Sequence, residues 1–592
     1  MTPGPMAAKL KTTGGGPAGE EGQILAIRFR VLLLIALCLT LAAGGFVQAH
    51  AEPFGRIFWH LLTVQDLPAA WSMVAMLAVC VFWAYSDCGR DHSPAEGFLL
   101  AIERYRHPIA TALWGLLCLG TLNVYRDHPL SMDEYAALFQ AKIFAGGQMH
   151  GVFPADLLDQ LLPKNFQNHF LMVNRSSGAV WSAYSPGFSL LLAPFALLGA
   201  PWACNPTLVA VSFLLVGRVV RDLTGSSQAV GCALLFALAS PAFVANGISY
   251  YSMPAHLLLN IAYAWSLFSV SPVRLLLAGF CGGWALMLHN PFPHAVFAAP
   301  WVLWLMFRSE RRFSDLLWLA AGYAPVVCVL GIGWALWQQH AMSVVTIAVA
   351  AGFPAGGASG AEGVGNALAR MVRGAVRWIQ MPDDSMLESR VAGLIKLWLW
   401  SAPAMLLLAW LGGRRASDVR LRLLGASALL TFFAYFFIPF DQGHGWGYRY
   451  FHSAWAVLPV FAALGAAKLH RAEGGKVVRQ LVVLTVFGLV FANALRLWQI
   501  GEFVSAHLAQ YPERSSAERQ LVLHSGRGYY ALDLIQNDPW LSRGDVVILV
   551  PPSDQGRAAL IERIGARDVS ARNRFGSSEE LTPEILERLR RP

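Results

Sequence analysis

Two adjacent carboxylates, Asp133 and Glu134, stand at the start of an amphipathic segment that follows an apolar run. Ser131 has the residue type that begins helices, and Glu134 has the spacing that completes a capping box with it. Neighbouring residues of a helix point about 100° apart, so the two acids are expected to do different jobs. We interpret Asp133 as a general base for an attacking hydroxyl, because the helix dipole favours an ionised acid in the first turn. Glu134 fits either a catalytic or a structural role.

A second polar stretch, residues 440–453, contains Asp441, His444, Tyr448 and Arg449 among glycines that let the backbone approach a ligand closely. Arg449 is the only Lys or Arg in this short loop. Because a guanidinium matches phosphate geometry in a bidentate way, we expect Arg449 to bind an anion, with Tyr448 and His444 beside it. The other interpretation is a basic side chain that reaches the interface within an aromatic belt.

Two shorter polar turns, 247–256 and 288–294, complete the candidate site. Each of their side chains alone is more often structural, but polar groups at membrane depth are costly and tend to mark function. The histidines and Asp133 could also hold a divalent metal, although no spacing matches a defined ligand motif, so the metal stays open. The cavity candidates are Tyr250, Tyr251, His256, His289, Asn290 and Asp441.

The elements that must position these residues cross a membrane. The chain has 592 residues, of which 56% are hydrophobic and 14% charged, whereas soluble domains carry about 25% charged residues. The formal charge of +9 needs no nucleic-acid partner, because Lys and Arg accumulate in the cytoplasmic loops of membrane proteins. The eight cysteines include no CxxC pair and indicate no disulfide framework. The chain has no Walker loop, no GxGxxG strand–helix unit, no HExxH and no GxSxG, which argues against an ATP-driven pump, a zinc protease and a serine hydrolase.

Hydropathy predicts an all-α polytopic fold of about thirteen spans, judged against the roughly 20 residues that cross a bilayer core. Several of the predicted spans are short or interrupted by proline, notably 274–289 and 294–307. The first span follows a cytoplasmic tail, 1–30, and is interpreted as an uncleaved anchor. Short loops that alternate along this layout are rich in Lys and Arg, which places Asp133, the other polar turns and the C-terminus outside the cytoplasm. The predicted spans are 31–48, 69–85, 108–125, 206–221, 228–246, 254–270, 274–289, 294–307, 316–337, 394–411, 421–438, 453–468 and 477–499.

Residues 31–499 are therefore predicted to form a transmembrane catalytic module with two large external loops, 126–205 and 338–393. The first loop contains a Pro-interrupted apolar run, 184–199, that is expected to lie at the interface as an amphipathic juxtamembrane helix. The second has a glycine-rich part and an amphipathic piece, 367–380. Residues 500–592 are more polar and are predicted to form a small external α/β domain, with a strand at 545–552 and helices at 530–537 and 557–565.

Four stretches in this order resemble the GT-C membrane glycosyltransferases: 131–148, 184–225, 447–461 and 532–549. The chain is most similar to the bacterial protein-O-mannosyltransferase-like and aminoarabinose-transferase-like groups of glycosyltransferase family 39, over about residues 108–550. The resemblance implies a polyprenyl-phosphate sugar donor and an inverting transfer outside the cytoplasm. It also implies that Asp133 activates the acceptor hydroxyl, that Arg449 binds the leaving lipid phosphate, and that Glu134 orients the site.

The chain departs from the family pattern in three places. Two spans precede the one that leads to the acid pair, where the family usually has one in total. Ser252 stands where an acidic residue is frequent, and His289 with Asn290 where a basic residue is common. These departures put the metal and phosphate contacts in doubt and are consistent with a divergent donor.

The resulting prediction is a multi-pass enzyme of the bacterial inner membrane, with a periplasmic site. It transfers a sugar from a polyprenyl-phosphate donor to a lipid, glycan or protein acceptor, and no cofactor beyond the open metal is expected. A transporter or flippase of lipid-linked sugars is one alternative, but matching halves are not seen. A glycan polymerase or ligase is another, but the acid pair directly after a span favours a base-driven transfer. The clustering of polar turns on one side argues against a purely structural subunit.

Overall fold

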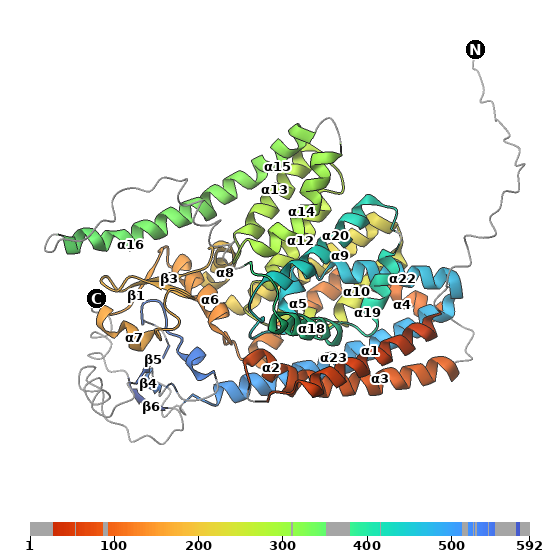
Figure 1. Ribbon diagram of the computed structural model, residues 1–592, viewed down its shortest axis with the longest axis horizontal. Helices are drawn as coiled ribbons and strands as arrows, with labels where there is room; N and C mark the ends of the chain where they lie inside the picture. The colour runs from red at the N-terminus through yellow and green to blue at the C-terminus, as the bar shows by residue number, and fades with distance from the viewer. Residues whose placement is uncertain are drawn as a thin grey trace, which may run out of the picture.

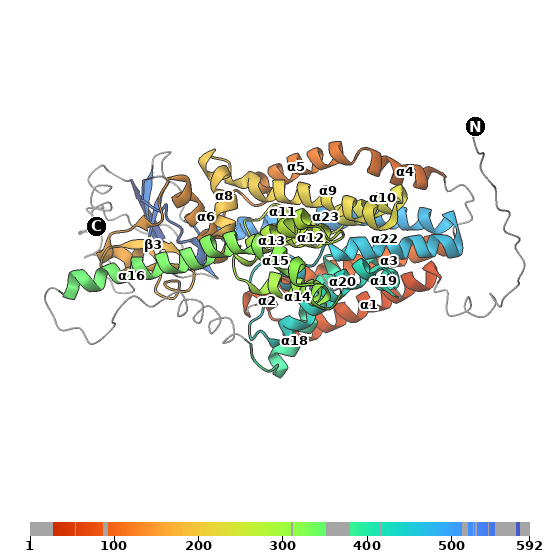
Figure 2. The same ribbon diagram turned by 90° about the horizontal axis from the view of Figure 1, so that it is seen from above.

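The computed structural model describes residues 28–53, 55–86, 93–308, 312–350, 379–414, 416–511, 519–524, 526, 530–542, 544–550 and 576–580. Within this part of the chain, the fold is a bundle of long helices with two small sheets gathered at one end (Figures 1 and 2). The segment that carries Asp133 lies at the boundary between the bundle and the sheets. The glycine-rich part at 351–366 and the helix predicted at 557–565 lie outside the described residues, as does the amphipathic piece predicted at 367–380 except for its last two residues.

Apolar helices make up the bundle. Their bounds are α1 Phe29–Ala49, α2 Ile57–Leu61, α3 Leu67–Ser86, α4 Ser93–Arg104, α5 Arg106–Asn123, α9 Cys204–Thr224, α10 Ser227–Leu238, α11 Pro241–Gly247, α12 Met253–Ser266, α13 Pro272–Leu286, α14 Phe292–Phe307, α15 Arg312–Val326, α16 Trp334–Ala350, α18 Asp384–Leu399, α19 Met405–Gly413, α20 Val419–Ala434, α21 Arg449–His452, α22 Val457–Glu473 and α23 Gly475–Leu508. Short π-helical turns join α2 to α3 and α15 to α16, so each of these pairs runs as one long helix.

The predicted all-α polytopic membrane fold is confirmed. Among the described residues, six helices are long and apolar enough to cross a membrane, and a seventh span is formed if α10 and α11 count together despite their 63° bend. The predicted span 394–411 is instead broken, because α18 ends at Leu399 and Ala404, with a left-handed φ of +63°, starts the separate helix α19. The count of thirteen spans stays a prediction.

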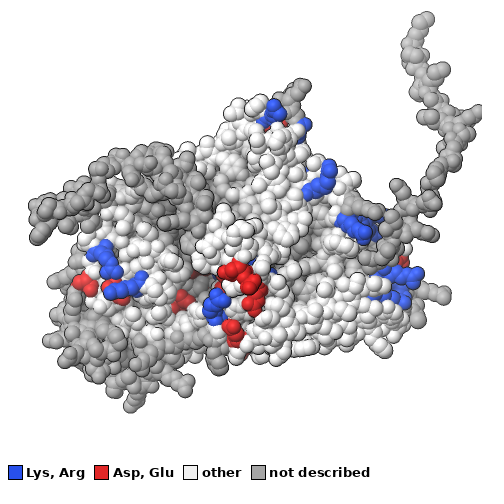
Figure 3. All heavy atoms as spheres, viewed as in Figure 1, with Lys and Arg blue, Asp and Glu red and all other residues white. Residues whose placement is uncertain are grey.

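The distribution of charged side chains on the surface agrees with a membrane-spanning bundle. Figure 3 shows a broad uncharged surface over the bundle, with Lys and Arg gathered mainly towards the parts of the bundle away from the sheets. An uncharged surface of this kind is what a bilayer core requires, because an exposed charge there is costly.

The remaining elements form a lobe beside the bundle, with bounds α6 Met132–Ala145, α7 Leu158–Leu161, α8 Gly187–Leu197, β1 Gly151–Val152, β2 Leu171–Val173, β3 Ala179–Ser182, β4 Gln520–His524, β5 Val546–Leu549 and β6 Gly576–Glu580. The first sheet has the antiparallel order β1-β3-β2. In the second, β4 lies between β5, which is parallel to it, and the antiparallel β6. The predicted strand at 545–552 is observed as β5, whereas the helix predicted at 530–537 is only a 3-10 turn, Ala531–Leu534.

The C-terminal strands and α6 share one apolar core. Leu521 of β4 and Ile548 of β5 are buried in the same cluster as Met132 of α6. Polar contacts reinforce this contact, because the Tyr135 hydroxyl donates to the carbonyl of Asn537 at 2.6 Å and accepts from its N–H at 2.9 Å. The first turn of α6 is thus anchored from the side opposite the bundle.

A closed ion cluster lies within the bundle. The Asp66 carboxylate is 2.5 Å from Lys396 Nζ and 2.8 Å from Arg496 Nη2, and it accepts a hydrogen bond from Trp400 Nε1 at 2.6 Å. The side chains of its three charged members are at most 2% exposed. This cluster ties the segment between α2 and α3 to α18 and α23.

Candidate active site

The first turn of α6 differs from the predicted capping box. Ser131 is the N-cap by its backbone, with φ −138° and ψ 165°, but its side chain makes no cap bond and lies 3.0 Å from the Tyr251 hydroxyl. Glu134 does reach back, although to the N–H of Leu130 rather than that of Ser131, at 2.6 Å. The helix start is therefore fastened to the turn that carries Tyr251.

Glu134 is fully buried and joins three segments. Its Oε1 accepts hydrogen bonds from the Tyr250 N–H at 2.8 Å and from the Tyr125 hydroxyl at 2.9 Å, in addition to the Leu130 bond on Oε2. Burial raises the pKa of Glu134 to about 7, against the lowering effect of these donors. Since all its contacts are internal, the geometry favours a positioning role for this carboxylate.

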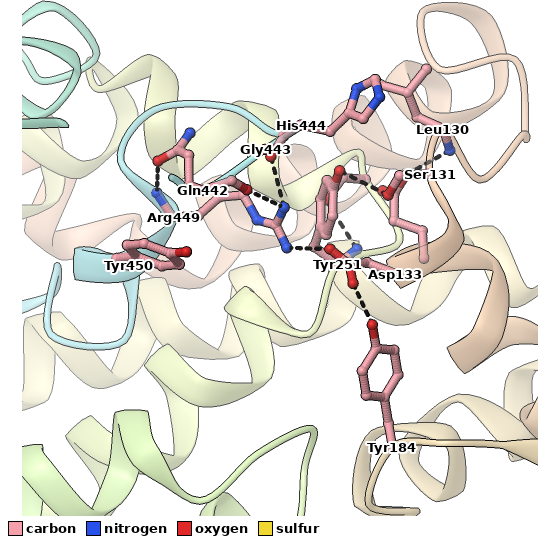
Figure 4. A network of polar contacts seen from close by, with 12 residues as sticks. Leu130, Ser131, Asp133, Tyr184, Tyr251, Gln442, Gly443, His444, Arg449 and Tyr450 are labelled. Atoms are coloured by element: carbon pink, nitrogen blue, oxygen red, sulfur yellow. Dashed lines mark hydrogen bonds and ion pairs between the residues drawn. The ribbon is translucent and has the colours of Figure 1, made fainter. Parts of the chain in front are cut away.

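Asp133 points the other way and meets Arg449 and Tyr184 (Figure 4). Its Oδ1 accepts a 2.5 Å hydrogen bond from the Tyr184 hydroxyl, and its Oδ2 lies 3.0 Å from Arg449 Nη2. Burial works to raise the pKa of Asp133, but the Arg449 charge and the Tyr184 hydrogen bond help to outweigh it and hold the pKa below its ordinary value. Asp133 is consequently an ionised carboxylate held at both oxygens.

The glycine-rich loop before α21 wraps around the Arg449 side chain. Gly445 has φ +117°, and a Cβ there would lie 2.2 Å from Arg449 Cδ, so only glycine fits. Arg449 Nη1 donates to the carbonyls of Gln442 at 3.0 Å and His444 at 2.7 Å. The guanidinium carbon also lies 4.0 Å from the centre of the Tyr251 ring, within the range of a cation–π contact. These contacts fix the cation so that Nη2 is directed at Asp133.

A pocket opens beside this ion pair, where α6, the start of α8 and two polar turns meet. One part of its wall is polar and another is apolar, and His289 packs against Tyr184 with ring centroids 3.8 Å apart. Burial lowers the pKa of His289 to about 4, so the imidazole is neutral at physiological pH. The lining residues are Asp133, Ala137, Tyr184, Ser185, Phe188, Ser189, Tyr251, Ser252, Leu288, His289 and Arg449.

The structure brings four of the predicted site residues to this pocket: Asp133, Arg449, Tyr251 and His289. Glu134 and Tyr250 lie directly behind it, joined by the hydrogen bond described above. The catalytic and binding roles assigned to all of them stay predictions.

The other five predicted residues do not line the pocket. Asp441 is 3.4 Å from Arg56, and His444 Nε2 is 3.6 Å from Asp533, although the His444 carbonyl holds Arg449. Asn290 accepts from the Phe292 N–H at 3.2 Å in the turn before α14. The last two, His256 and Tyr448, are buried in the bundle, His256 within α12 and Tyr448 against Gly393.

Tyr184 is the main residue that sequence reasoning missed. It precedes a Ser-Pro-Gly turn that docks on the chain before α14, where the Gly187 N–H donates to the Met287 carbonyl at 2.7 Å. A Cβ at Gly187 would lie 2.4 Å from that carbonyl oxygen, so the close approach requires glycine. The adjacent Pro and Gly were the one local signal of a docked turn here.

A metal site finds no support in the described residues, where no group of three or more His, Cys, Asp or Glu side chains is arranged to hold an ion. Asp133, the acid that was considered as a ligand, is instead paired with a cation.

No family model and no curated protein matches the chain. Among solved structures, it is similar to ArnT from Cupriavidus metallidurans bound to undecaprenyl phosphate, with 12% identity and a TM-score of 0.48 over 76% of this chain and 87% of that one. The apo state of the same protein gives 12% identity and a TM-score of 0.44, over 77% and 87%. At this identity and these TM-scores, the function of this chain has to be argued from its own residues.

Proposed function

We propose that this chain is a membrane glycosyltransferase that moves a sugar from a polyprenyl-phosphate donor to a hydroxyl of a lipid, glycan or protein acceptor, with inversion. The observation that carries the proposal is the contact between an ionised Asp133 and a buried Arg449 at a single pocket. A carboxylate supplies a base for a hydroxyl, and a guanidinium supplies a partner for a phosphate.

In the proposed reaction, the acceptor hydroxyl gives its proton to Asp133 while its oxygen attacks the anomeric carbon of the sugar. The bond between that carbon and the phosphate oxygen breaks, and the electron pair leaves with the phosphate. Arg449 then stabilises the charge that develops on the phosphate, which is the larger catalytic effect in a site of this kind. The neutral His289 and the pocket hydroxyls are suited to contacts with the hydroxyls of a sugar.

Inversion is supported by the number of carboxylates. Asp133 is the only acid among the described residues that line the pocket, and Glu134 is turned into a separate hydrogen-bond network. A double displacement would need a second carboxylate or another nucleophile to form a covalent intermediate. A single base and a single phosphate-binding cation fit a direct displacement.

A lipid-linked donor is supported by the apolar part of the pocket. Ala137, Phe188 and Leu288 belong to a buried cluster that includes Ala255 of the bundle helix α12. The polar head of the donor would face Arg449, and its chain would leave towards the membrane-facing bundle. The charge bias of the loops supports a site on the periplasmic side of the inner membrane.

The proposal is tested by mass spectrometry of lipid-linked sugars and surface glycans from a deletion strain. We expect a polyprenyl-phosphate sugar to accumulate and an acceptor to lose one sugar, with both restored by the wild-type gene. Asp133→Asn should be produced normally but lower transfer by about 10²–10⁴-fold, the usual contribution of a general base. Asp441→Asn, which removes a carboxylate outside the pocket, is the matched control and should restore transfer. Wild-type turnover by Asp133→Asn would contradict the assignment of the base.

A further inference from the structure

The Asp133–Arg449 pair raises a conflict between the two proposed roles. A base is most effective when its pKa is near the working pH, yet Arg449 lowers the pKa of Asp133. The cation that should bind a phosphate is likewise already paired with a carboxylate at 3.0 Å. Asp133 would be a stronger base, and Arg449 a better phosphate-binding cation, if a phosphate replaced Asp133 at Arg449 during the reaction.

The three guanidinium nitrogens of Arg449 differ in what they contact. Both Nη1 hydrogens are directed at backbone carbonyls, those of Gln442 and His444, and Nε is buried with no partner among the described residues. Nη2 is the nitrogen that Asp133 contacts, and both side chains line the pocket. A phosphate that approaches Arg449 from the pocket therefore meets the atom that Asp133 holds.

Asp133 is the more exposed and less enclosed member of the pair. Its side chain is 27% exposed, whereas that of Arg449 is 7% exposed and fixed by two carbonyls and the Tyr251 ring. Tyr184 gives Asp133 a second anchor through its other oxygen, at 2.5 Å. The carboxylate can thus turn away from Arg449 and remain in the pocket.

We propose that the phosphate of the lipid donor displaces the Asp133 carboxylate from Arg449, so that donor binding releases the base. One cation then serves two anions in turn, and the acceptor hydroxyl meets a free carboxylate only after the donor is bound. Loss of the Arg449 contact also removes an interaction that lowers the pKa of Asp133, which makes it a stronger base. This inference rests on the proposed function and adds an order to it: donor first, acceptor second.

The test measures the affinity of the full-length protein in detergent for undecaprenyl phosphate, with undecaprenol as the lipid that lacks phosphate. Removing the competing carboxylate frees Arg449, so we expect Asp133→Asn to bind undecaprenyl phosphate about tenfold more tightly than the wild type. Arg449→Ala should weaken binding by at least a similar factor. In the double variant, Asp133→Asn should add nothing to Arg449→Ala, because the competition needs both partners.

Two controls separate competition from general charge and from misfolding. Asp441→Asn removes the same charge from the loop that carries Arg449, but at a carboxylate paired with Arg56, and should leave the affinity unchanged. Asp133→Ser is a second variant without the carboxylate, in case Asp133→Asn elutes as an aggregate in size-exclusion chromatography.

The outcomes distinguish the two proposals. If the wild type prefers undecaprenyl phosphate to undecaprenol but neither Asp133 variant binds undecaprenyl phosphate more tightly, the displacement is wrong and the proposed function still stands. A gain that persists without Arg449, or that Asp441→Asn reproduces, indicates general charge repulsion and also overturns it. If wild-type protein binds undecaprenyl phosphate no better than undecaprenol, the proposed donor class falls, and the displacement falls with it.

Discussion

Two of the acid–base clusters among the described residues, one around Asp66 and one around Asp133, differ in how far they are closed. The Asp66 side chain is 0% exposed and pairs with Lys396 and Arg496 between helices of the bundle. Asp133, with Arg449, has a side chain that is 27% exposed and opens on a pocket at the end of the bundle. Each acid also accepts a hydrogen bond from an aromatic side chain, Trp400 for Asp66 and Tyr184 for Asp133.

The difference shows that a buried ion pair alone does not mark a site. In the Asp66 cluster, two cations share one carboxylate, and the Arg496 guanidinium lies 4.1 Å from the centre of the Trp400 ring. None of the residues that line the pocket beside Asp133 belongs to this cluster, and its ion pairs join helices of the bundle. Access from the pocket is what makes the Asp133 pair a candidate for chemistry.

The largest expected effect comes from the closed cluster. Asp66→Asn would leave Lys396 and Arg496 without a counter-charge inside the bundle, and breaking a buried ion pair in this way costs about 3–5 kcal/mol. For Asp66→Asn we expect a large drop in the yield of folded protein and in its unfolding temperature in detergent. Asp133→Asn should keep a yield and an unfolding temperature close to those of the wild type.

Lys396→Met is the matched control for that prediction. It keeps a one-to-one pair of Asp66 and Arg496, which lie 2.8 Å apart, and should therefore cost much less than Asp66→Asn. If Asp66→Asn were as stable as the wild type, the closed cluster would have no structural role and the comparison would fail.

The next effect concerns Glu134, which lies behind the open pair. Glu134→Gln turns an amide N–H₂ towards at least one of three donors, so we expect a cost of about 1–3 kcal/mol. The pKa of Glu134 in the folded protein is about 7, against 4.5 as its ordinary value. Because the folded state holds this proton more tightly, its contribution to stability is complete below pH 4.5 and is lost as the pH rises through about 7.

Thermal unfolding at a series of pH values checks this prediction. The wild type should lose stability between pH 4.5 and about 7, and Glu134→Gln should lack that part of the slope. Glu52→Gln, at an exposed carboxylate, is the control and should keep it. An unchanged slope in Glu134→Gln would show that this carboxylate is not the group that titrates.

Sequence reasoning found the membrane fold because hydropathy is a property of single positions and their immediate neighbours. It also selected Asp133 and Arg449, each for a local reason: an acid in a first helical turn, and a lone arginine in a glycine-rich loop. It could not pair them, since they are 316 residues apart, and it missed the Asp66–Lys396 pair, which is separated by 330.

The misplaced candidates have a physical cause as well. His256 and Tyr448 were selected because they fall in or beside polar turns, but which way a side chain points depends on the packing of distant helices. Tyr184 carried no polar pattern, and its position depends on the docking of Gly187 against the Met287 carbonyl. Contacts that depend on tertiary packing leave little trace in one sequence.

The smallest expected effect tests the aromatic donor of the open pair. Tyr184→Phe removes one hydrogen bond from Asp133, a net loss of about 0.5–1.5 kcal/mol, and so lowers transfer at the optimum by at most about tenfold. That bond lowers the pKa of Asp133, so its loss raises the pKa, and the acidic limb of the pH–rate profile moves to higher pH. Tyr450→Phe, whose hydroxyl donates to the Asp441 carbonyl at 2.8 Å, should leave the limb in place. In the closed cluster, Trp400→Phe should change stability alone, because no transferred proton meets Asp66. If the acidic limb of the pH–rate profile does not move in Tyr184→Phe, the base is a group other than Asp133. The Asp133 cluster would then no longer differ from the Asp66 cluster by a catalytic role.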